Sequence, residues 1–353
     1  MDSKKIFAIG AAVVVAVAAI GIAIVVLNNN NGSENGELSV VYLKKNGYET
    51  EMVAEKKGFF GDFGLTVKGQ TVTGSGQDAV NMLLAGSVDI AATGQGPVAN
   101  TLHNYSDDLV IICGVNHSTG GQVIVAKIPG LVAYDKATDN KAAVKDSFAT
   151  VSSDGADPIK IGVQQGATTE SELKGWLKAM GIPFNDFDKN DDGKYVKLVN
   201  YKANTLVSTL AAGTIDAMAA SQPFPTQALE IDGAYQIGTN ADVDSYDCSM
   251  YITTKKVYDE KKDLIEKFIK GLDKTSKYMA DPANTAECKQ IVNDVINDQG
   301  AVDGAFAIAQ WKTAWTDDMA NTLLKTCTKK GFSEVTLDTC KEKCPFRELL
   351  AGL

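Results

Sequence analysis

The feature that most constrains the fold is a phrase that the sequence contains twice. Residues 83–97 read LLAGSVDIAATGQGP, and residues 210–224 read LAAGTIDAMAASQPF. Each copy holds the apolar end of a helix, a Gly that ends the helix, a strand and a polar turn. The similarity begins further upstream, so that the whole of 65–97 resembles 195–224. Strand–helix–strand units of this kind predict an α/β fold with a mostly parallel sheet. From the pattern alone, either two similar lobes or the ordinary likeness of such units explains the repetition.

The longest apolar run lies at the N-terminus. Lys4 and Lys5 precede an uncharged stretch, 6–27, which as a helix spans roughly 33 Å and can cross a bilayer. No small-x-small cleavage site follows it, so an uncleaved anchor is favoured over a cleaved signal peptide. Lysines before the run and acidic residues after it place the N-terminus inside the cell and the rest of the chain outside it. We predict a membrane anchor or signal segment over 1–27 and a flexible linker over 28–37.

Six cysteines in an oxidising compartment suggest disulfides. A zinc site is the rival interpretation, but paired C-x-x-C motifs are absent and the sequence has two His. Cys113 and Cys248 lie in apolar, strand-like runs, where buried thiols are as reasonable as a bonded pair. The predicted disulfides therefore join the other four: Cys288, Cys327, Cys340 and Cys344.

Short polar loops follow the predicted strands and precede helices. In open α/β sheets, ligands bind beyond the carboxyl ends of the strands, where helix N-termini expose free N–H groups. We therefore predict a cleft that encloses one small molecule. The helix that follows 164–169 carries a predicted capping box, from Thr169 to Glu172. The candidate loops are 73–76, 93–97, 164–169, 201–204 and 221–225.

Several phrases resemble one family, the extracytoplasmic substrate-binding proteins of ABC transporters, in the nitrate/sulfonate/taurine and thiamine-precursor branch. They are AEKKGFFGDFGLTV and GSGQDAVNMLLAGSVDIAATGQGPVANTL in the first half, then GATTESELKGWLKAMGI, LVSTLAAGTIDAMAASQPFPTQALE and YITTKKVYDEKKDLIEKFIKGLDKTSKYMADP. They cover most of 40–282. The resemblance implies a periplasmic-binding-protein fold of type II, and it favours two similar lobes as the meaning of the repeat.

The resemblance also implies boundaries, a location and partners. The first lobe would comprise 38–126 and 241–353, with the second lobe at 127–240 between them. The protein would lie outside the cytoplasm, at the cell surface, and deliver a small molecule to a transporter permease and its ATPase. The net charge of −10 argues against a nucleic-acid partner. The segment 128–158 is longer than the family pattern, and the cysteine-containing tail is unfamiliar.

Carried over by position, the family's ligand contacts fall on the loops between strands and helices. An oxyanion of nitrate or sulfonate type suits helix N-termini, although the only Arg, Arg347, lies outside every candidate loop. Lys44 and Lys45 are the nearest cations and are expected to be solvated. A flat heterocycle such as a pyrimidine could equally be sandwiched by Gln165, Gln222 and Phe224 with Tyr42 or Tyr48. The predicted ligand residues are Ser75, Gly76, Thr93, Gly94, Gln95, Gly96, Asn116, His117, Gln165, Gly166, Thr168, Thr169, Gln222 and Phe224.

We predict a binding protein without a catalytic residue or cofactor. The related pyrimidine-synthase branch uses a reactive His, and here the candidates are His103 and His117. No Ser-His-Asp order or phosphate-binding Lys motif is present. A surface sensor or adhesin with the same fold is a third alternative.

A structural Ca²⁺ site is predicted in the loop FDKNDDGKYV. Asp188, Asn190 and Asp192 alternate before Gly193, as at the start of an EF-hand loop. The motif is incomplete, because Val199 stands where the bidentate Glu should be.

Overall fold

The computed structural model describes residues 36–72 and 74–353. The predicted membrane anchor, 1–27, lies outside the described residues, as does the linker up to residue 35. Gly36 and Glu37 already belong to the first strand, so the linker ends earlier than predicted. Within the described ranges, no helix combines the length and the apolar character needed to span a bilayer.

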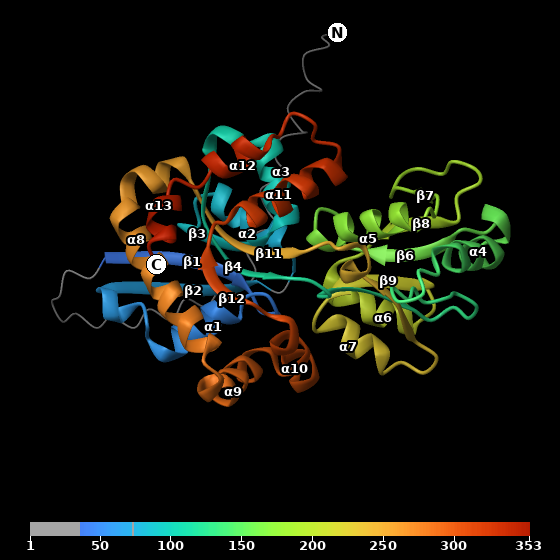
Figure 1. Cartoon of the computed structure of the whole chain (residues 1–353), viewed down its shortest axis with the longest axis horizontal. Coiled ribbons are helices and arrows are strands. Elements are labelled where there is room, and N and C mark those ends of the chain that lie inside the picture. The colour runs from blue at the N-terminus through green and yellow to red at the C-terminus, as the bar shows by residue number, and fades with distance from the viewer. Residues whose placement is uncertain (1–35, 73) are drawn as a thin grey trace, which may run out of the picture. The chain divides into compact units, whose positions relative to one another are not determined.

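The first lobe is built on a six-stranded sheet in the order β12–β4–β11–β3–β1–β2 (Figure 1). Strand β1 pairs parallel with β2 and β3, whereas β11 runs antiparallel between β3 and β4. The sheet is therefore mixed rather than wholly parallel. Its strands are β1 (Gly36–Leu43), β2 (Leu65–Val72), β3 (Ile90–Gly94), β4 (Leu109–Ser118), β11 (Asp247–Thr254) and β12 (Trp311–Ala314).

The second lobe has its own sheet, in the order β10–β5–β9–β6–β8–β7. Strand β5 is antiparallel to β9 and β10, although the sequence analysis assigned 122–126 to the first lobe. That assignment is wrong because the chain crosses between the lobes before β5 begins. The strands are β5 (Gln122–Ala126), β6 (Ile159–Val163), β7 (Phe184–Asn185), β8 (Val196–Asn200), β9 (Ala217–Ser221) and β10 (Tyr235–Thr239).

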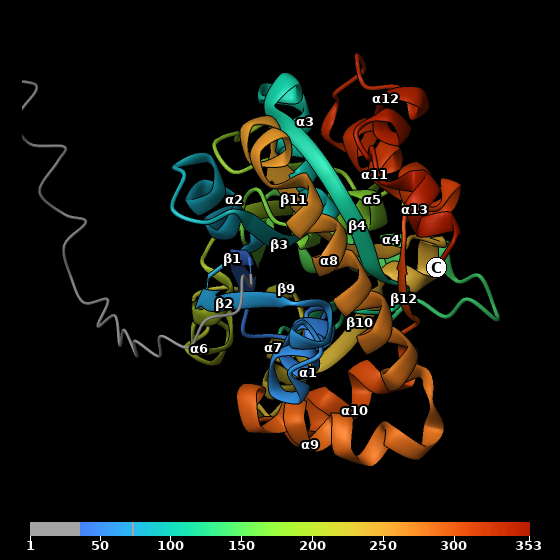
Figure 2. The same ribbon diagram turned by 90° about the vertical axis from the view of Figure 1, so that its left-hand side faces the viewer.

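Helices cover both sheets. In the first lobe, α8 packs across strands from β2 to β12 and also contacts α1 (Figure 2). The helices of this lobe are α1 (Glu49–Lys57), α2 (Gly76–Leu84), α3 (Gln95–Asn104), α8 (Lys255–Ala280), α9 (Thr285–Ile296), α10 (Gln299–Ile308), α11 (Asp317–Lys330), α12 (Leu337–Glu342) and α13 (Arg347–Ala351). Those of the second lobe are α4 (Lys141–Val151), α5 (Thr168–Ala179), α6 (Leu206–Ala211) and α7 (Phe224–Leu229).

The repeated phrase occupies equivalent places in the two sheets. Its first copy forms β2, α2 and β3, and its second copy forms β8, α6 and β9. The order β11–β3–β1–β2 in one sheet corresponds to β5–β9–β6–β8 in the other. The two-lobed prediction is therefore confirmed, and the repeat marks the unit that both lobes share.

Each lobe has an apolar core that the helix periodicity predicts. On α5, Leu173, Trp176 and Leu177 are buried against the second sheet, as their helical spacing requires.

The predicted capping box at the start of α5 does not form, because Ala167 is the N-cap and no side chain caps the helix. Thr169 and Glu172 instead bond to Gln122 and Lys329.

The C-terminal tail packs on the first lobe, and its cysteines are free thiols. All six cysteines in the structure are unbonded and buried, so the predicted disulfides among Cys288, Cys327, Cys340 and Cys344 are not formed. Burial raises the pKa of the Cys340 thiol to about 11, which keeps it protonated and poor in the thiolate that oxidation requires. The Cys344 thiol donates to the Ile112 carbonyl over 3.4 Å.

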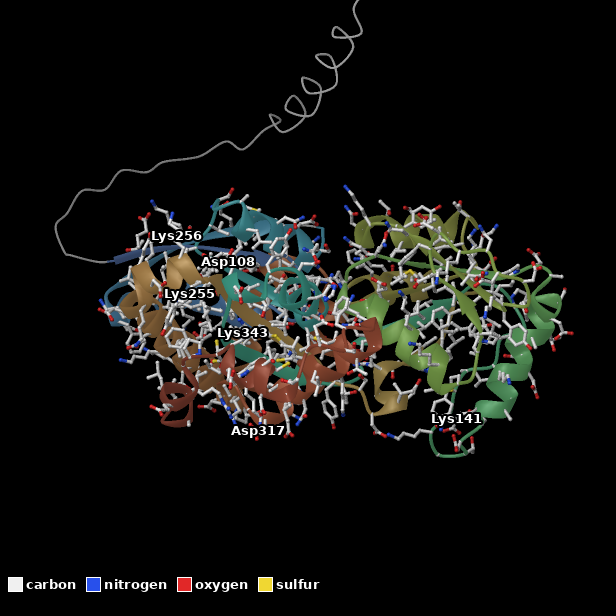
Figure 3. The ribbon with its side chains drawn as sticks, turned by 90° about the horizontal axis from the view of Figure 1, so that it is seen from above. Asp108, Lys141, Lys255, Lys256, Asp317 and Lys343 are labelled. Atoms are coloured by element: carbon white, nitrogen blue, oxygen red, sulfur yellow. The ribbon has the colours of Figure 1, made fainter. Side chains whose placement is uncertain are left out.

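Charged side chains cover the outside of both lobes (Figure 3). Lys255 and Lys256 lie at the start of α8, and Lys141 lies at the start of α4. The single Arg, Arg347, bonds Asp317 over 2.8 Å at this surface. The residue best suited to clamp an oxyanion is therefore committed to an ion pair outside the predicted site.

Candidate ligand-binding cleft

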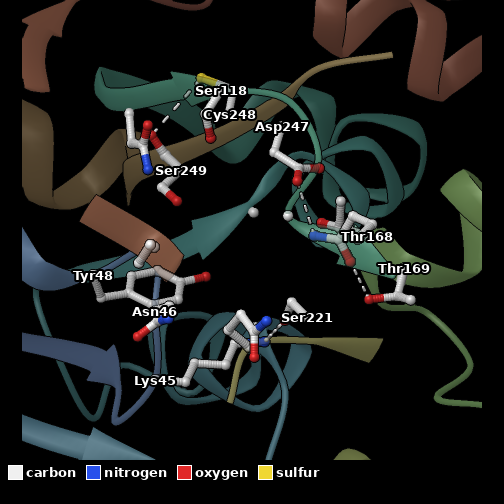
Figure 4. A pocket seen from close by; sticks show the side chains of 18 of the residues that line it. Lys45, Asn46, Tyr48, Ser118, Thr168, Thr169, Ser221, Asp247, Cys248 and Ser249 are labelled. Atoms are coloured by element: carbon white, nitrogen blue, oxygen red, sulfur yellow. Dashed lines mark hydrogen bonds between the residues drawn. The ribbon is translucent and has the colours of Figure 1, made fainter. Parts of the chain in front are cut away.

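A cavity of about 100 Å³ lies between the two lobes (Figure 4). The loop between β1 and α1 and the starts of α3 and β11 form its wall on the first lobe. The start of α5 and the end of β9 face them from the second lobe. Its polar side chains belong to Lys45, Asn46, Tyr48, Glu49, Gln95, Asn116, Ser118, Gln122, Thr168, Thr169, Ser221, Gln222, Asp247 and Ser249.

Two crossover segments join the lobes, and Gly121 of the first one lines the cavity. The chain passes from β4 to β5 through 119–121 and returns from β10 to β11 through 240–246. The Asn240 side-chain oxygen accepts from the Gly120 amide over 2.8 Å and from the Gln122 amide over 3.2 Å. These bonds join the two crossovers to each other. The crossovers are therefore the natural hinge for a rigid-body motion of the lobes.

Lys45 brings a cation into the cavity. Its ammonium donates to the Ser221 hydroxyl on the opposite lobe over 3.3 Å, as Figure 4 shows. Burial lowers the pKa of Lys45 to about 8, and the nearby Asp247 carboxylate opposes that shift. The sequence places this Lys at the end of the first strand but does not reveal that it turns inward.

The first turn of α1 adds a carboxyl group. Glu49 is buried, and its Oε2 accepts from the Gly47 amide over 2.8 Å. No described group bonds its Oε1. Burial raises the pKa of Glu49 to about 7. Beside it, the Tyr48 ring is buried in the wall, where it offers an aromatic edge or face to a ligand.

Asp247 is the second carboxyl group of the cavity. Gln122 donates to its Oδ2 over 3.1 Å, and Gln95 donates to its Oδ1 over 3.4 Å. Burial and the nearby Glu172 raise the pKa of Asp247 to about 7. Thr169 donates to Gln122, so this network joins Asp247 to the start of α5.

The lobes are closed on each other beside the cavity. The Gly96 amide donates to the Thr168 hydroxyl over 3.1 Å, and the Asn100 amide donates to the Gly166 carbonyl over 3.3 Å. A Cβ atom at Gly96 would lie 2.5 Å from the Thr168 backbone nitrogen, far inside contact distance. Glycine is therefore required at this position for the lobes to approach so closely.

The structure brings half of the predicted ligand residues to the cavity. Ser75 instead caps α2, accepting and donating bonds with Asp78. His117 bonds the Thr322 hydroxyl over 2.9 Å, and burial lowers its pKa. Those that line the cavity are Gly76, Gly94, Gln95, Asn116, Thr168, Thr169 and Gln222. Those that do not are Ser75, Thr93, Gly96, His117, Gln165, Gly166 and Phe224.

Residues that the sequence analysis did not name supply the carboxyl groups of the cavity. Glu49 begins helix α1, whose sequence contains no recognisable binding motif. Asp247 begins a strand that is far in sequence from every candidate loop. Gln122 begins β5, just after the crossover from the first lobe. The one available signal is that both Lys45 and Glu49 follow the first strand at its carboxyl end, where ligand loops are expected.

The predicted Ca²⁺ ligands lie elsewhere, on the surface of the second lobe. Asp188, Asn190 and Asp192 are exposed, and Lys197 donates to the Asn190 side-chain oxygen. Across the described ranges, no three His, Cys, Asp or Glu side chains gather as a metal site. Because the predicted set includes an Asn oxygen, the Ca²⁺ site stays a prediction.

The sequence of residues 31–293 matches the NMT1-like family. The chain belongs to this family. No curated protein matches the sequence. The periplasmic nitrate-binding protein NrtA of Synechocystis PCC 6803 is similar in structure, with a TM-score of 0.68 and 16% identity over 89% of this chain and 86% of that one.

Two further solved structures share the fold. The periplasmic aliphatic sulphonate-binding protein SsuA of Escherichia coli has a TM-score of 0.63 and 14% identity over 84% of this chain and 87% of that one. The desulfurization enzyme DSZB has a TM-score of 0.63 and 11% identity over 90% and 98%. The resemblance to substrate-binding proteins is confirmed. Because an enzyme also has this fold, binding without catalysis stays a prediction for this chain.

Proposed function

We propose that this NMT1-like protein captures one small molecule between its lobes, outside the cytoplasm, and delivers it to an ABC transporter permease. The enclosed polar cavity and the direct contact between Gly96 and Thr168 support capture by closure. The apolar run at 6–27 supports attachment to the membrane. The similarity in structure to a nitrate-binding and a sulphonate-binding periplasmic protein supports a transport role.

We propose an oxyanion of nitrate or sulfonate type as the ligand. One observation carries this choice: the Lys45 ammonium lies inside the cavity, bonded to Ser221 of the other lobe. The start of α5 and several hydroxyls add donors. Glu49 and Asp247 oppose an anion only when ionised, and their raised pKa values near 7 leave them largely protonated below neutral pH.

A flat heterocycle is the second candidate. Tyr48 in the wall provides a stacking surface, and Asp247 with Gln95 and Gln122 provides acceptors and donors for ring nitrogens. A thermal-shift panel on the full chain in mild detergent decides between them. Nitrate or sulfonates should raise the melting temperature, because they bind the folded state. A shift with pyrimidines alone would favour the heterocycle, and no shift with any compound would favour a sensor or adhesin.

Delivery to a permease is tested separately from binding. The genes next to this one should encode a permease and an ATPase, and deletion of the protein should abolish uptake of the ligand found in the panel. Uptake that continues without it would contradict the transport role and leave capture alone.

A further inference from the structure

A second cavity between the lobes lies outside the ligand cleft. This groove, of about 490 Å³, is lined by α5 on one side and by the end of α11 on the other. The contact from Gly96 to Thr168 and the bond from Asn100 to Gly166 separate it from the cleft. The two helices contact each other and belong to different lobes, as their labels in Figure 1 show.

Four lysines gather at this groove. Lys174 and Lys178 lie one turn apart on α5, and Lys329 and Lys330 end α11. Lysines in the last turn of a helix also favour its dipole, a role that needs no ligand. That role also fits Lys178, in the last turn of α5, but it does not explain the burial of Lys330, whose side chain is only 9% exposed.

The carboxylates nearby are already bound. Lys174 bonds Glu170 over 2.6 Å and Asp186 over 2.9 Å. Lys329 bonds both oxygens of Glu172 over 2.9 Å. The second oxygen of Glu170 accepts from the Gly166 amide over 2.6 Å. Two lysines therefore bond three carboxylates, and the other two lysines more than balance the one negative charge that remains.

Lys330 is ion-paired with Glu170, but neither Lys330 nor Lys178 donates a hydrogen bond to a carboxylate that the structure describes. The Lys330 nitrogen lies 3.9 Å from Glu170, beyond hydrogen-bond distance. Among the residues that the structure describes, no carboxylate pairs with Lys178. Burial lowers the pKa of Lys330, because a charged ammonium is costly to remove from water. An oxyanion in the groove would give both ammonium groups an acceptor.

We propose that the groove between α5 and α11 binds a phosphate-type oxyanion through Lys330 and Lys178. Such an ion bonds both lobes at once, so it binds the closed arrangement better than any open one. By linkage, the ion and the cleft ligand raise each other's affinity. The site depends on the approach of α5 to α11 and not on the identity of the cleft ligand.

Calorimetric titration of the full chain in detergent with inorganic phosphate, at low ionic strength, tests this proposal. We expect Lys330→Met to weaken phosphate binding at least about tenfold and Lys178→Met by a smaller factor, because charge-assisted bonds are lost. Lys262→Met, an exposed lysine on α8, is the matched control and should leave affinity unchanged. If Lys330→Met fails to fold, exposed Lys178 carries the test, and its unchanged affinity would overturn the proposal.

The cleft is the competing location for the ion, so Lys45→Met is titrated in parallel. We expect it to keep phosphate affinity while it weakens the cleft ligand. Loss of phosphate binding in Lys45→Met alone would place the ion in the cleft and overturn the proposal, as would no binding by the unaltered chain. Glycerol phosphate forms a second arm: tighter binding than inorganic phosphate identifies an organic phosphate as the occupant, and equal binding identifies the free ion.

Discussion

The first lobe places Lys45, Glu49 and Asp247 on the cavity wall, whereas the lining residues described in the second lobe are neutral: Gln122, Ala167, Thr168, Thr169, Ser221 and Gln222. The two lobes share one topology, yet they divide the chemistry. A ligand's charge is therefore expected to bind the first lobe, and the second lobe then closes with neutral hydrogen bonds. Neutral donors lose less on desolvation than ions, so closure costs little.

The lobes also treat buried acids differently. Glu51 and Glu55 of the first lobe are bonded by Tyr251 and Tyr42, and one oxygen of each carboxyl group has no partner among the described residues. In the second lobe, Glu170 and Glu172 are each bonded by a lysine. Burial raises the pKa of Glu51 and of Glu55, because a charged carboxylate loses its hydration there. These two acids therefore make the stability of the first lobe depend on pH.

Blocking closure should have the largest effect. Gly96→Ala places a Cβ atom against the Thr168 backbone, so the lobes can no longer meet. We expect ligand affinity to fall by roughly 100-fold, because the closed form, in which both lobes can contact the ligand, becomes rare. Calorimetry with the ligand found in the thermal-shift panel measures this. Gly304→Ala in α10, with open space around its Cα atom, is the matched control, and an equal loss there would contradict the explanation.

Removing charges from the first lobe should cost more than removing hydroxyls from the second. Hydrogen bonds to ionised groups are worth about 1.5–3 kcal/mol, against about 0.5–1.5 for neutral ones. We therefore expect Lys45→Met to weaken an anionic ligand by about 10- to 100-fold and Ser221→Ala by less than about tenfold. Equal losses in the two variants would mean that both lobes bind the charged group, which breaks the comparison.

Folding stability should fall as the pH rises, because of the acids in the first lobe. Burial raises the pKa of Glu51 from 4.5 to about 8, so the folded state holds a proton that the unfolded state has lost. The penalty is absent below pH 4.5 and grows as the pH rises towards 8, where it reaches roughly 4–5 kcal/mol, at about 1.4 kcal/mol per pH unit. Urea unfolding at pH 5 and pH 8 measures it. Glu51→Gln should flatten this dependence, whereas Glu260→Gln, at the exposed surface of α8, should not.

Ligand affinity should also depend on pH, and its sign reports the charge of the ligand. Between pH 6 and 9, Glu49 and Asp247, with pKa values near 7, lose protons, and Lys45, with a pKa near 8, becomes neutral. The cavity grows more negative, so an anion should bind about tenfold more weakly at pH 9. Asp247→Asn should reduce this slope. Tighter binding at high pH would identify a cationic group in the ligand instead.

The smallest effect concerns Ca²⁺ at the surface of the second lobe. Asp188, Asn190 and Asp192 are exposed and lack the bidentate Glu of a complete loop, so we expect millimolar affinity and a small rise in melting temperature. Calorimetry on the full chain checks this, with Asp188→Asn as the variant. No heat of binding at millimolar Ca²⁺ would remove the site.

The sequence alone determines the α/β class and the strands whose ends face the cavity, and the family resemblance adds the two lobes. Hydrophobic periodicity and Gly stops are local, and the repeated phrase carries them twice. The loop containing Thr168 and Thr169 was found because every strand end in such a sheet points to the same edge.

Only the tertiary structure decides which polar residues meet. Asp247 lies 152 positions after Gln95 in the chain, yet they share a hydrogen bond across the cavity wall. Lys45 contacts Ser221 only because the crossover strands hold the two lobes face to face. Thr169 and Glu172 match a local capping pattern, but partners from other elements bind them instead. Burial and charge depend on distant segments, so no local pattern could reveal the carboxyl groups in the cavity or the free thiols of the tail.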